Sequence, residues 1–143
     1  MKLIIVDVNA AHKVFARPPR KQWKDLQESL TRGKPFDVVA VHGGELTREY
    51  QGTNIWPICV ELSRVGRMRA FSHPLVDNET EAVRRVGICK SNDMHIIALA
   101  SVSNCRLLCS QDKALQQDFR NPQLINRPRG KIYGGSNHNH LLG

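Results

Sequence analysis

Short apolar runs rich in β-branched residues alternate with helix-like segments along the chain. The runs are KLIIV at 2–6, FDVVAV at 36–41, RMRAF at 67–71, CRLLC at 105–109 and GKIYG at 130–134. Most have the length and composition of short strands, and the segments between them have helical patterns. Strands that alternate with helices favour a mainly parallel sheet with crossover helices. The sequence therefore predicts an α/β fold.

The helix-like segments carry recognisable start and stop signals. Residues 20–32 place Trp23, Leu26 and Leu30 on one side of a helix, and Gly33 ends it. Further helical segments are expected at 7–15, 45–50, 55–65, 77–88 and 111–119, and from Asn92 onward. The length of 143 residues fits one domain. We expect this domain over residues 1–135 and a flexible tail over 136–143, where periodicity is lost.

The basic residues are unevenly distributed. The formal net charge is +8, and residues 12–34 contain seven lysines and arginines against two acids. Residues 120–131 contain four cations and no acid. Such segments suit RNA or DNA, because phosphate neutralisation releases counterions, but a solvated basic face or a surface for an acidic protein is the alternative. The candidates for phosphate contacts are Arg17, Arg20, Lys21, Arg127, Arg129 and Lys131.

The chain has no feature of a membrane or secreted protein. No apolar run approaches the ~20 residues of a spanning helix, and Asp7 interrupts the apolar N-terminal run. The four cysteines form no C-x-x-C pair, which favours reduced thiols over disulfides or zinc. We therefore expect a cytoplasmic protein.

Carboxylates follow the predicted strands. Asp7 comes after LIIV, Glu45 lies just past VVAV and two glycines, and Asp112 follows RLLC. Asp93 stands at a helix start, where the helix dipole tolerates a negative side chain. Because ligands of parallel sheets bind beyond the carboxyl ends of the strands, these four acids are expected to converge. Mg²⁺ or Mn²⁺ would relieve their repulsion, since both ions prefer oxygen ligands.

Each acid also has a structural alternative. Asp93 could cap a helix, Asp7 could bind backbone amides, and Asp112 could open a turn. Glu45 could be a solvated residue paired with Arg48. The set of four, rather than any single member, carries the interpretation.

The chain resembles the PIN-domain family of metal-dependent ribonucleases, which includes VapC-type toxins. The matching segments are LIIVDVNAA, VVAVHGGELTREY, NDMHIIALA and CRLLCSQDKAL, whose order and spacing cover nearly the whole chain. The pair formed by NDMHIIALA and the closely following LLCSQDK is the most specific. The resemblance implies a three-layer α/β/α fold and an acidic pocket that holds Mg²⁺ or Mn²⁺ for RNA cleavage.

The resemblance also implies roles for individual residues. Asp7, Asp93 and Asp112 would bind metal, and Glu45 would be a ligand or a water-orienting base, with Asp118 as an alternative contributor. The polar positions that would hold the acids or metal-bound water are Asn9, Asn92 and Ser110.

The sequence thus predicts a divalent-metal-dependent endoribonuclease that hydrolyses RNA phosphodiester bonds, and the resemblance makes the toxin of a toxin–antitoxin pair one candidate role. The alternative is a non-catalytic PIN-like module that binds RNA or a protein. An antitoxin partner and a homodimer are further expectations. The tail sequence HNH at 138–140 lacks the separated ββα-metal arrangement of the nucleases known by those letters.

Overall fold

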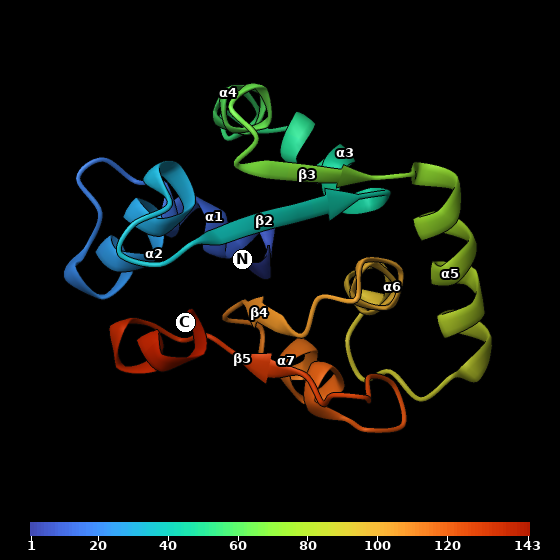
Figure 1. Ribbon diagram of the computed structural model, residues 1–143. Coiled ribbons are helices and arrows are strands. Elements are labelled where there is room, and N and C mark those ends of the chain that lie inside the picture. Colours follow the sequence, from blue (N-terminus) through green and yellow to red (C-terminus); the bar gives the residue numbers. More distant parts are fainter.

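A five-stranded, all-parallel sheet forms the centre of the computed structural model, which describes residues 1–143 (Figure 1). The strand order is β3-β2-β1-β4-β5. The strands are β1 (Lys2–Val6), β2 (Val38–Gly43), β3 (Met68–Phe71), β4 (Leu107–Cys109) and β5 (Lys131–Ile132). The predicted α/β class is confirmed.

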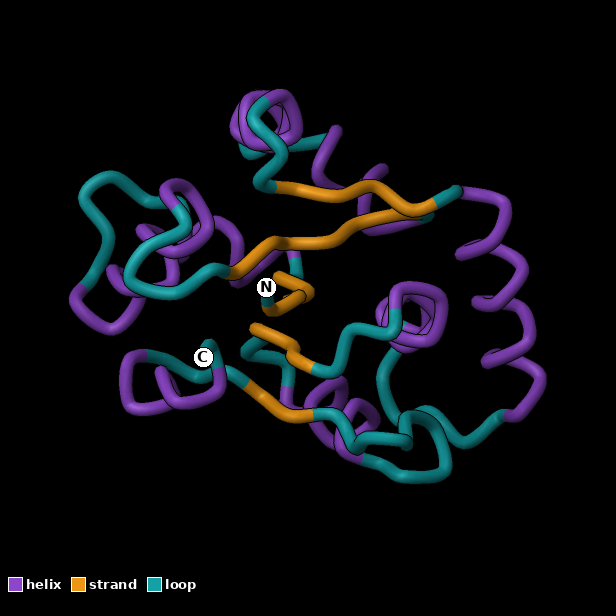
Figure 2. Tube along the Cα trace, viewed as in Figure 1, coloured by secondary structure: helices purple, strands orange, loops and turns teal.

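Helices flank this sheet, consistent with a three-layer α/β/α arrangement (Figures 1 and 2). They are α1 (Val8–Val14), α2 (Lys21–Arg32), α3 (Glu45–Gln51), α4 (Trp56–Arg64), α5 (His73–Val86), α6 (Met94–Ser103) and α7 (Lys113–Arg120). A 3₁₀ helix, η1 (Ser136–Leu141), follows β5. None of the helices combines the length and apolar character needed to cross a membrane.

The core sits between the sheet and its helices. Every residue of β2 is buried, as are the last three of β1, which explains their apolar, β-branched composition. Residues 95–100 of α6 are buried without a break. This helix packs against α5, which lies at the right of Figure 1, and contacts β2 and β3, so it needs no polar face.

Two segments differ from the sequence expectations. Helix α5 begins at His73 rather than at residue 77, because Ser72 occupies the N-cap position and Pro74 fits the first helical turn. Residues 136–143, expected as a tail, make contacts with the rest of the chain. Asn139 accepts a hydrogen bond from Tyr133 Oη at 2.8 Å and donates one from Nδ2 to Asp25 at 2.7 Å, while Leu142 is buried. These contacts hold η1 against α2.

Candidate metal centre

The carboxyl ends of β1 and β4 meet where the connections of the sheet diverge. The chain builds β2 and β3 on one side of β1, and β4 and β5 on the other. Asp7 directly follows β1, and Ser110 directly follows β4. Ser110 Oγ donates a hydrogen bond to Asp7 Oδ2 at 3.0 Å, and Asp7 is only 5% exposed. A buried carboxylate therefore sits at the position where open α/β sheets bind ligands.

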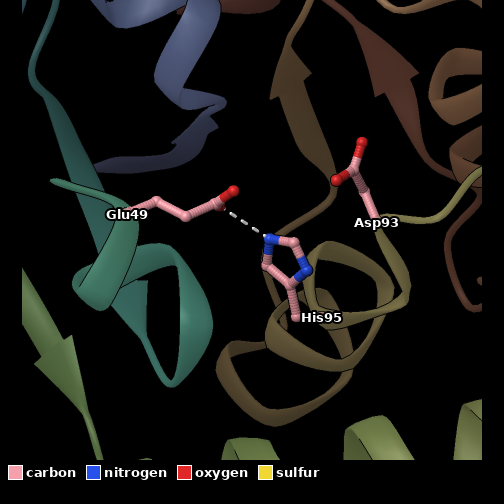
Figure 3. Close-up of side chains that lie close together, drawn as sticks. All are labelled: Glu49, Asp93 and His95. Atoms are coloured by element: carbon pink, nitrogen blue, oxygen red, sulfur yellow. Dashed lines mark hydrogen bonds and ion pairs between the residues drawn. The ribbon is translucent and has the colours of Figure 1, made fainter. Parts of the chain in front are cut away.

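A second group of donors lies between α3 and α6. One ligand atom from each of Glu49, Asp93 and His95 falls within 4.8 Å of the others. Figure 3 shows the Glu49 carboxylate facing the His95 ring, with Asp93 extending from the start of α6. His95 Nε2 donates to Glu49 Oε1 at 2.9 Å. Two carboxylates and an imidazole thus form a cluster that could hold a metal ion.

The electrostatics join Asp7 to this cluster. Burial raises the pKa of the Asp7 carboxyl, the Ser110 hydrogen bond opposes this, and the charge of Glu49 raises the pKa further. Burial also raises the pKa of Asp93, and the charges of Asp7, Glu49 and Asp112 act in the same direction. Without a cation, these carboxylates therefore oppose one another's ionisation.

His95 lies within this acidic surrounding, which favours its protonated form. Burial acts to lower the pKa of the imidazole, but the hydrogen bond to Glu49 and the charges of Glu49, Asp93 and Glu45 outweigh it. The pKa of His95 is therefore raised above its ordinary value. The ring can offset part of the carboxylate repulsion when protonated and can bind metal when neutral.

Two acids at helix starts behave differently. Asp112 caps α7, because its Oδ1 accepts a hydrogen bond from the backbone N–H of Leu115 at 3.2 Å. Asp93 occupies the N-cap position of α6, yet its carboxylate makes no capping hydrogen bond. One oxygen of Asp112 thus serves as a helix cap, and its role as a metal ligand stays a prediction. The carboxylate oxygens of Asp93 make no capping hydrogen bond and are free for a ligand.

Glu45 lies at the rim of the same site. It is half-exposed and pairs with Arg48 at 3.3 Å, while Glu49, one turn later on α3, reaches the donor cluster. Both glutamates line a cavity of about 350 Å³ together with Asn92 and Asp93. Glu49 therefore lies closer to Asp93 and His95 than Glu45 does. The role of Glu45 as a metal ligand or water-orienting base stays a prediction.

Sequence reasoning missed Glu49 and His95 as site residues. Glu49 follows Glu45 by four residues, a spacing that puts both on one face of a helix. His95 follows Asp93 by two residues and lies in the first turn of α6. Both spacings are visible signals, although neither identifies a ligand alone.

The remaining predicted polar residues have different surroundings. Ser110 supports Asp7 directly and also accepts a hydrogen bond from the backbone N–H of Asp112 at 3.2 Å. Asn92 is exposed beside Asp93 in the cavity wall, and Asn9 is exposed in the first turn of α1. Ser110 is thus the one of the three that binds an acid of the site.

Asp118 holds the loop that leads to the site. Its side chain is buried, with 2% of the residue exposed. The carboxylate accepts one hydrogen bond from the backbone N–H of Lys90 and another from that of Ser91, both with an N–O distance of 2.9 Å. Asp93 follows two residues after Ser91. The role of Asp118 is therefore to support this loop, rather than to bind metal.

The predicted phosphate contacts fall into two separate regions. One set is exposed in the connection between α1 and α2 and at the start of α2: Arg17, Arg20 and Lys21. The other precedes or begins β5, at the amino edge of the parallel sheet: Arg127, Arg129 and Lys131. Because the five residues of β1 span about 16 Å, this second set lies at the edge opposite Asp7.

The donors present fit a divalent cation. Asp7, Glu49 and Asp93 offer carboxylate oxygens, which suit hard cations such as Mg²⁺ and Mn²⁺, and His95 offers a nitrogen that suits transition metals. A cation there would replace the mutual repulsion of the carboxylates by attraction.

Comparison with known proteins gives no family assignment. No protein-family model, no curated protein and no solved structure matches the chain. The functional conclusion therefore depends on the residues and geometry of the site.

Proposed function

We propose that this protein is a divalent-metal-dependent endoribonuclease. The observation that carries the proposal is the cluster of Glu49, Asp93 and His95, together with the charge interactions of its acids with Asp7. Asp7 comes from the end of β1, Glu49 from α3 and Asp93 from the start of α6. The pKa values of Asp7 and Asp93 are raised, and a cation would stabilise the ionised form of both carboxylates.

The residues of the site have separate roles in this proposal. Asp7, Glu49 and Asp93 hold the metal, and Ser110 fixes the orientation of the Asp7 carboxylate. A bound Mg²⁺ or Mn²⁺ would polarise the phosphoryl oxygen and favour ionisation of water at neutral pH. His95, held by Glu49, is placed to accept or donate a proton at Nε2 once that hydrogen bond is exchanged.

Two further features support RNA as the substrate. The net charge of +8 favours binding of a polyanion. The order and spacing of the acids resemble those of PIN-domain ribonucleases, with Glu49 taking the place that the sequence pattern gives to Glu45. These features favour a nuclease of this kind over hydrolases that act on neutral substrates.

Cleavage of labelled RNA by the full chain tests the proposal. We expect cutting with Mn²⁺ or Mg²⁺, none in EDTA, and rates reduced at least about 100-fold in Asp7→Asn and Glu49→Gln. Glu61→Gln is the matched control, because Glu61 is exposed on α4 and pairs only with Arg64. Circular dichroism should show that all three variants are folded.

The same experiment separates the alternative. If the folded wild-type protein binds RNA in a salt-dependent way and never cleaves it with either metal, the protein is a binding module and the nuclease proposal fails.

A further inference from the structure

A second cavity lies at the amino edge of the sheet. Its volume is about 340 Å³, and it is bordered by the starts of β1, β4 and β5, the end of α6 and the last residue of η1. Four cationic residues line it: Lys2, Arg106, Arg129 and Lys131. No aspartate or glutamate is among its lining residues.

None of these four cations pairs with a carboxylate. The seven ion pairs of the structure involve other residues; Asp37, the acid nearest the start of β1, pairs with Arg67 at 2.9 Å and with the amino group of Met1 at 3.8 Å. Several positive charges around one cavity repel one another unless an anion lies between them. The charge pattern therefore favours a negatively charged ligand.

Arg106 is held in place without losing its charge. Its guanidinium donates to the backbone carbonyls of Ala100 at 2.7 Å, Pro128 at 3.0 Å, Cys105 at 3.1 Å and Asn126 at 3.5 Å, which leaves one N–H of Nη2 for a ligand. These neutral partners fix the side chain in advance of binding, which reduces the entropy that binding would cost. The contact with Ala100 also covers carbonyl groups near the end of α6, whose negative dipole would otherwise repel an anion.

The cavity wall also has an apolar part. Leu3, Leu107 and Leu141 contribute to it, and its volume is near the lower end of the range for small-molecule sites. A single nucleotide combines a phosphate with flat and partly apolar groups at this scale. A nucleic acid strand that continues beyond the site in both directions would instead require an open groove.

We propose that this cavity binds a terminal phosphate monoester attached to a nucleoside, either a free mononucleotide or the 5′-phosphate end of an RNA. A phosphate monoester carries nearly two negative charges at neutral pH and accepts several charge-assisted hydrogen bonds. The cavity faces the amino edge of the sheet and Asp7 the carboxyl edge. The bound phosphate is therefore distinct from the one at the metal centre, and the inference does not depend on the nuclease proposal.

Calorimetric titration of the full chain in EDTA tests this site. The probes are AMP and GMP, adenosine and guanosine, and one RNA 10-mer with either a 5′-phosphate or a 5′-hydroxyl. We expect the phosphate-bearing member of at least one pair to bind at least about tenfold more tightly. Tighter binding of AMP or GMP than of its nucleoside would identify a free mononucleotide as the ligand. Tighter binding of the 5′-phosphate RNA than of the 5′-hydroxyl RNA would identify the 5′ end of RNA as the ligand.

Variants locate the binding. Lys2→Gln/Arg129→Gln removes two exposed cations of the cavity and should weaken phosphate binding at least about tenfold. Lys24→Gln/Arg85→Gln removes two exposed cations away from the cavity and should change phosphate binding less than about twofold, apart from general salt-dependent effects. Equal affinity for both members of every pair, or equal losses in the two double variants, would overturn the proposal.

Asp7→Asn distinguishes this site from the metal centre. We expect it to retain phosphate binding in EDTA whether or not the protein cleaves RNA. Loss of phosphate binding in folded Asp7→Asn would instead assign the ligand to the carboxyl edge and overturn a separate cavity site.

Discussion

Removal of the Asp118 carboxylate should destabilise the protein and loosen the candidate metal centre. Asp118 is 2% exposed and accepts hydrogen bonds from two backbone N–H groups, those of Lys90 and Ser91. A hydrogen bond to a charged acceptor contributes about 1.5–3 kcal/mol, and water can partly replace the carboxylate at the exposed residue Lys90. We therefore expect Asp118→Ala to lower the unfolding free energy by about 2–5 kcal/mol.

Asp118→Asn should have a smaller effect. Its single amide oxygen can still accept from Ser91, but its NH₂ group would face the N–H of Lys90 at the other oxygen position. We expect a loss of about 1–3 kcal/mol. Because Asp93 follows this loop, Mn²⁺ affinity should fall about 10- to 100-fold in the same variant.

Urea unfolding and Mn²⁺ titration measure these effects. Gln117→Ala is the control, because Gln117 is the exposed neighbour of Asp118 on α7. If Asp118→Ala unfolds within about 0.5 kcal/mol of the wild type, the buried N–H groups do not depend on this carboxylate and the reasoning is refuted.

Three further predictions concern single side chains. Burial lowers the pKa of His42 to about 4, so the unfolded chain takes up this proton near pH 6.5 and the folded protein only near pH 4. The unfolding free energy should fall as the pH drops from about 6.5 to about 4, and His42 should account for about 3 kcal/mol of this fall. Urea unfolding of His42→Gln should show a smaller fall over the same pH range. Burial raises the pKa of Asp7, so its charged carboxylate is less stable in the folded protein than in the unfolded chain. Asp7→Asn should therefore melt a few degrees higher in EDTA by calorimetry, and a lower melting temperature would contradict this. In kinetic assays, Glu49→Gln should lower the rate of RNA cleavage at least about 100-fold, and Glu45→Gln should lower it less than about fivefold. The reverse order would show that Glu45, at the rim of the site, is the essential glutamate.

The parallel sheet and the position of Asp7 could be predicted from sequence because both depend on local patterns. Apolar runs of strand length alternate with helical segments, and an acid after the first strand of a parallel sheet must lie at the carboxyl edge. Asp93 could be placed at a helix start for the same reason. The sequence could not show that the Asp93 carboxylate makes no capping hydrogen bond, since this depends on its three-dimensional surroundings.

The choice between Glu45 and Glu49 required three-dimensional information. Helix α3 leaves β2 through Gly43 and Gly44, and Gly44 has φ 58°, a left-handed conformation that favours glycine. The direction of α3 after this turn decides which glutamate faces α6. Sequence spacing gives the common face of the two residues, but not its orientation.

The C-terminal residues show a second limit of sequence patterns. Residues 136–143 have no apolar periodicity, yet η1 is held by the contacts of Asn139 with Tyr133 and Asp25, and by the burial of Leu142. Such anchoring uses isolated polar contacts between distant positions. The sequence pattern does not reveal these contacts.

The central claim is that carboxylates gathered beyond β1 and beside α6 hold a divalent cation. Titration of Mn²⁺ into the metal-free protein, followed by calorimetry, tests it most directly. We expect saturable binding by the wild type and by the surface control Glu61→Gln, and affinity reduced at least about tenfold in Asp93→Asn. Absence of binding, or equal affinity in folded Asp93→Asn, would contradict the claim.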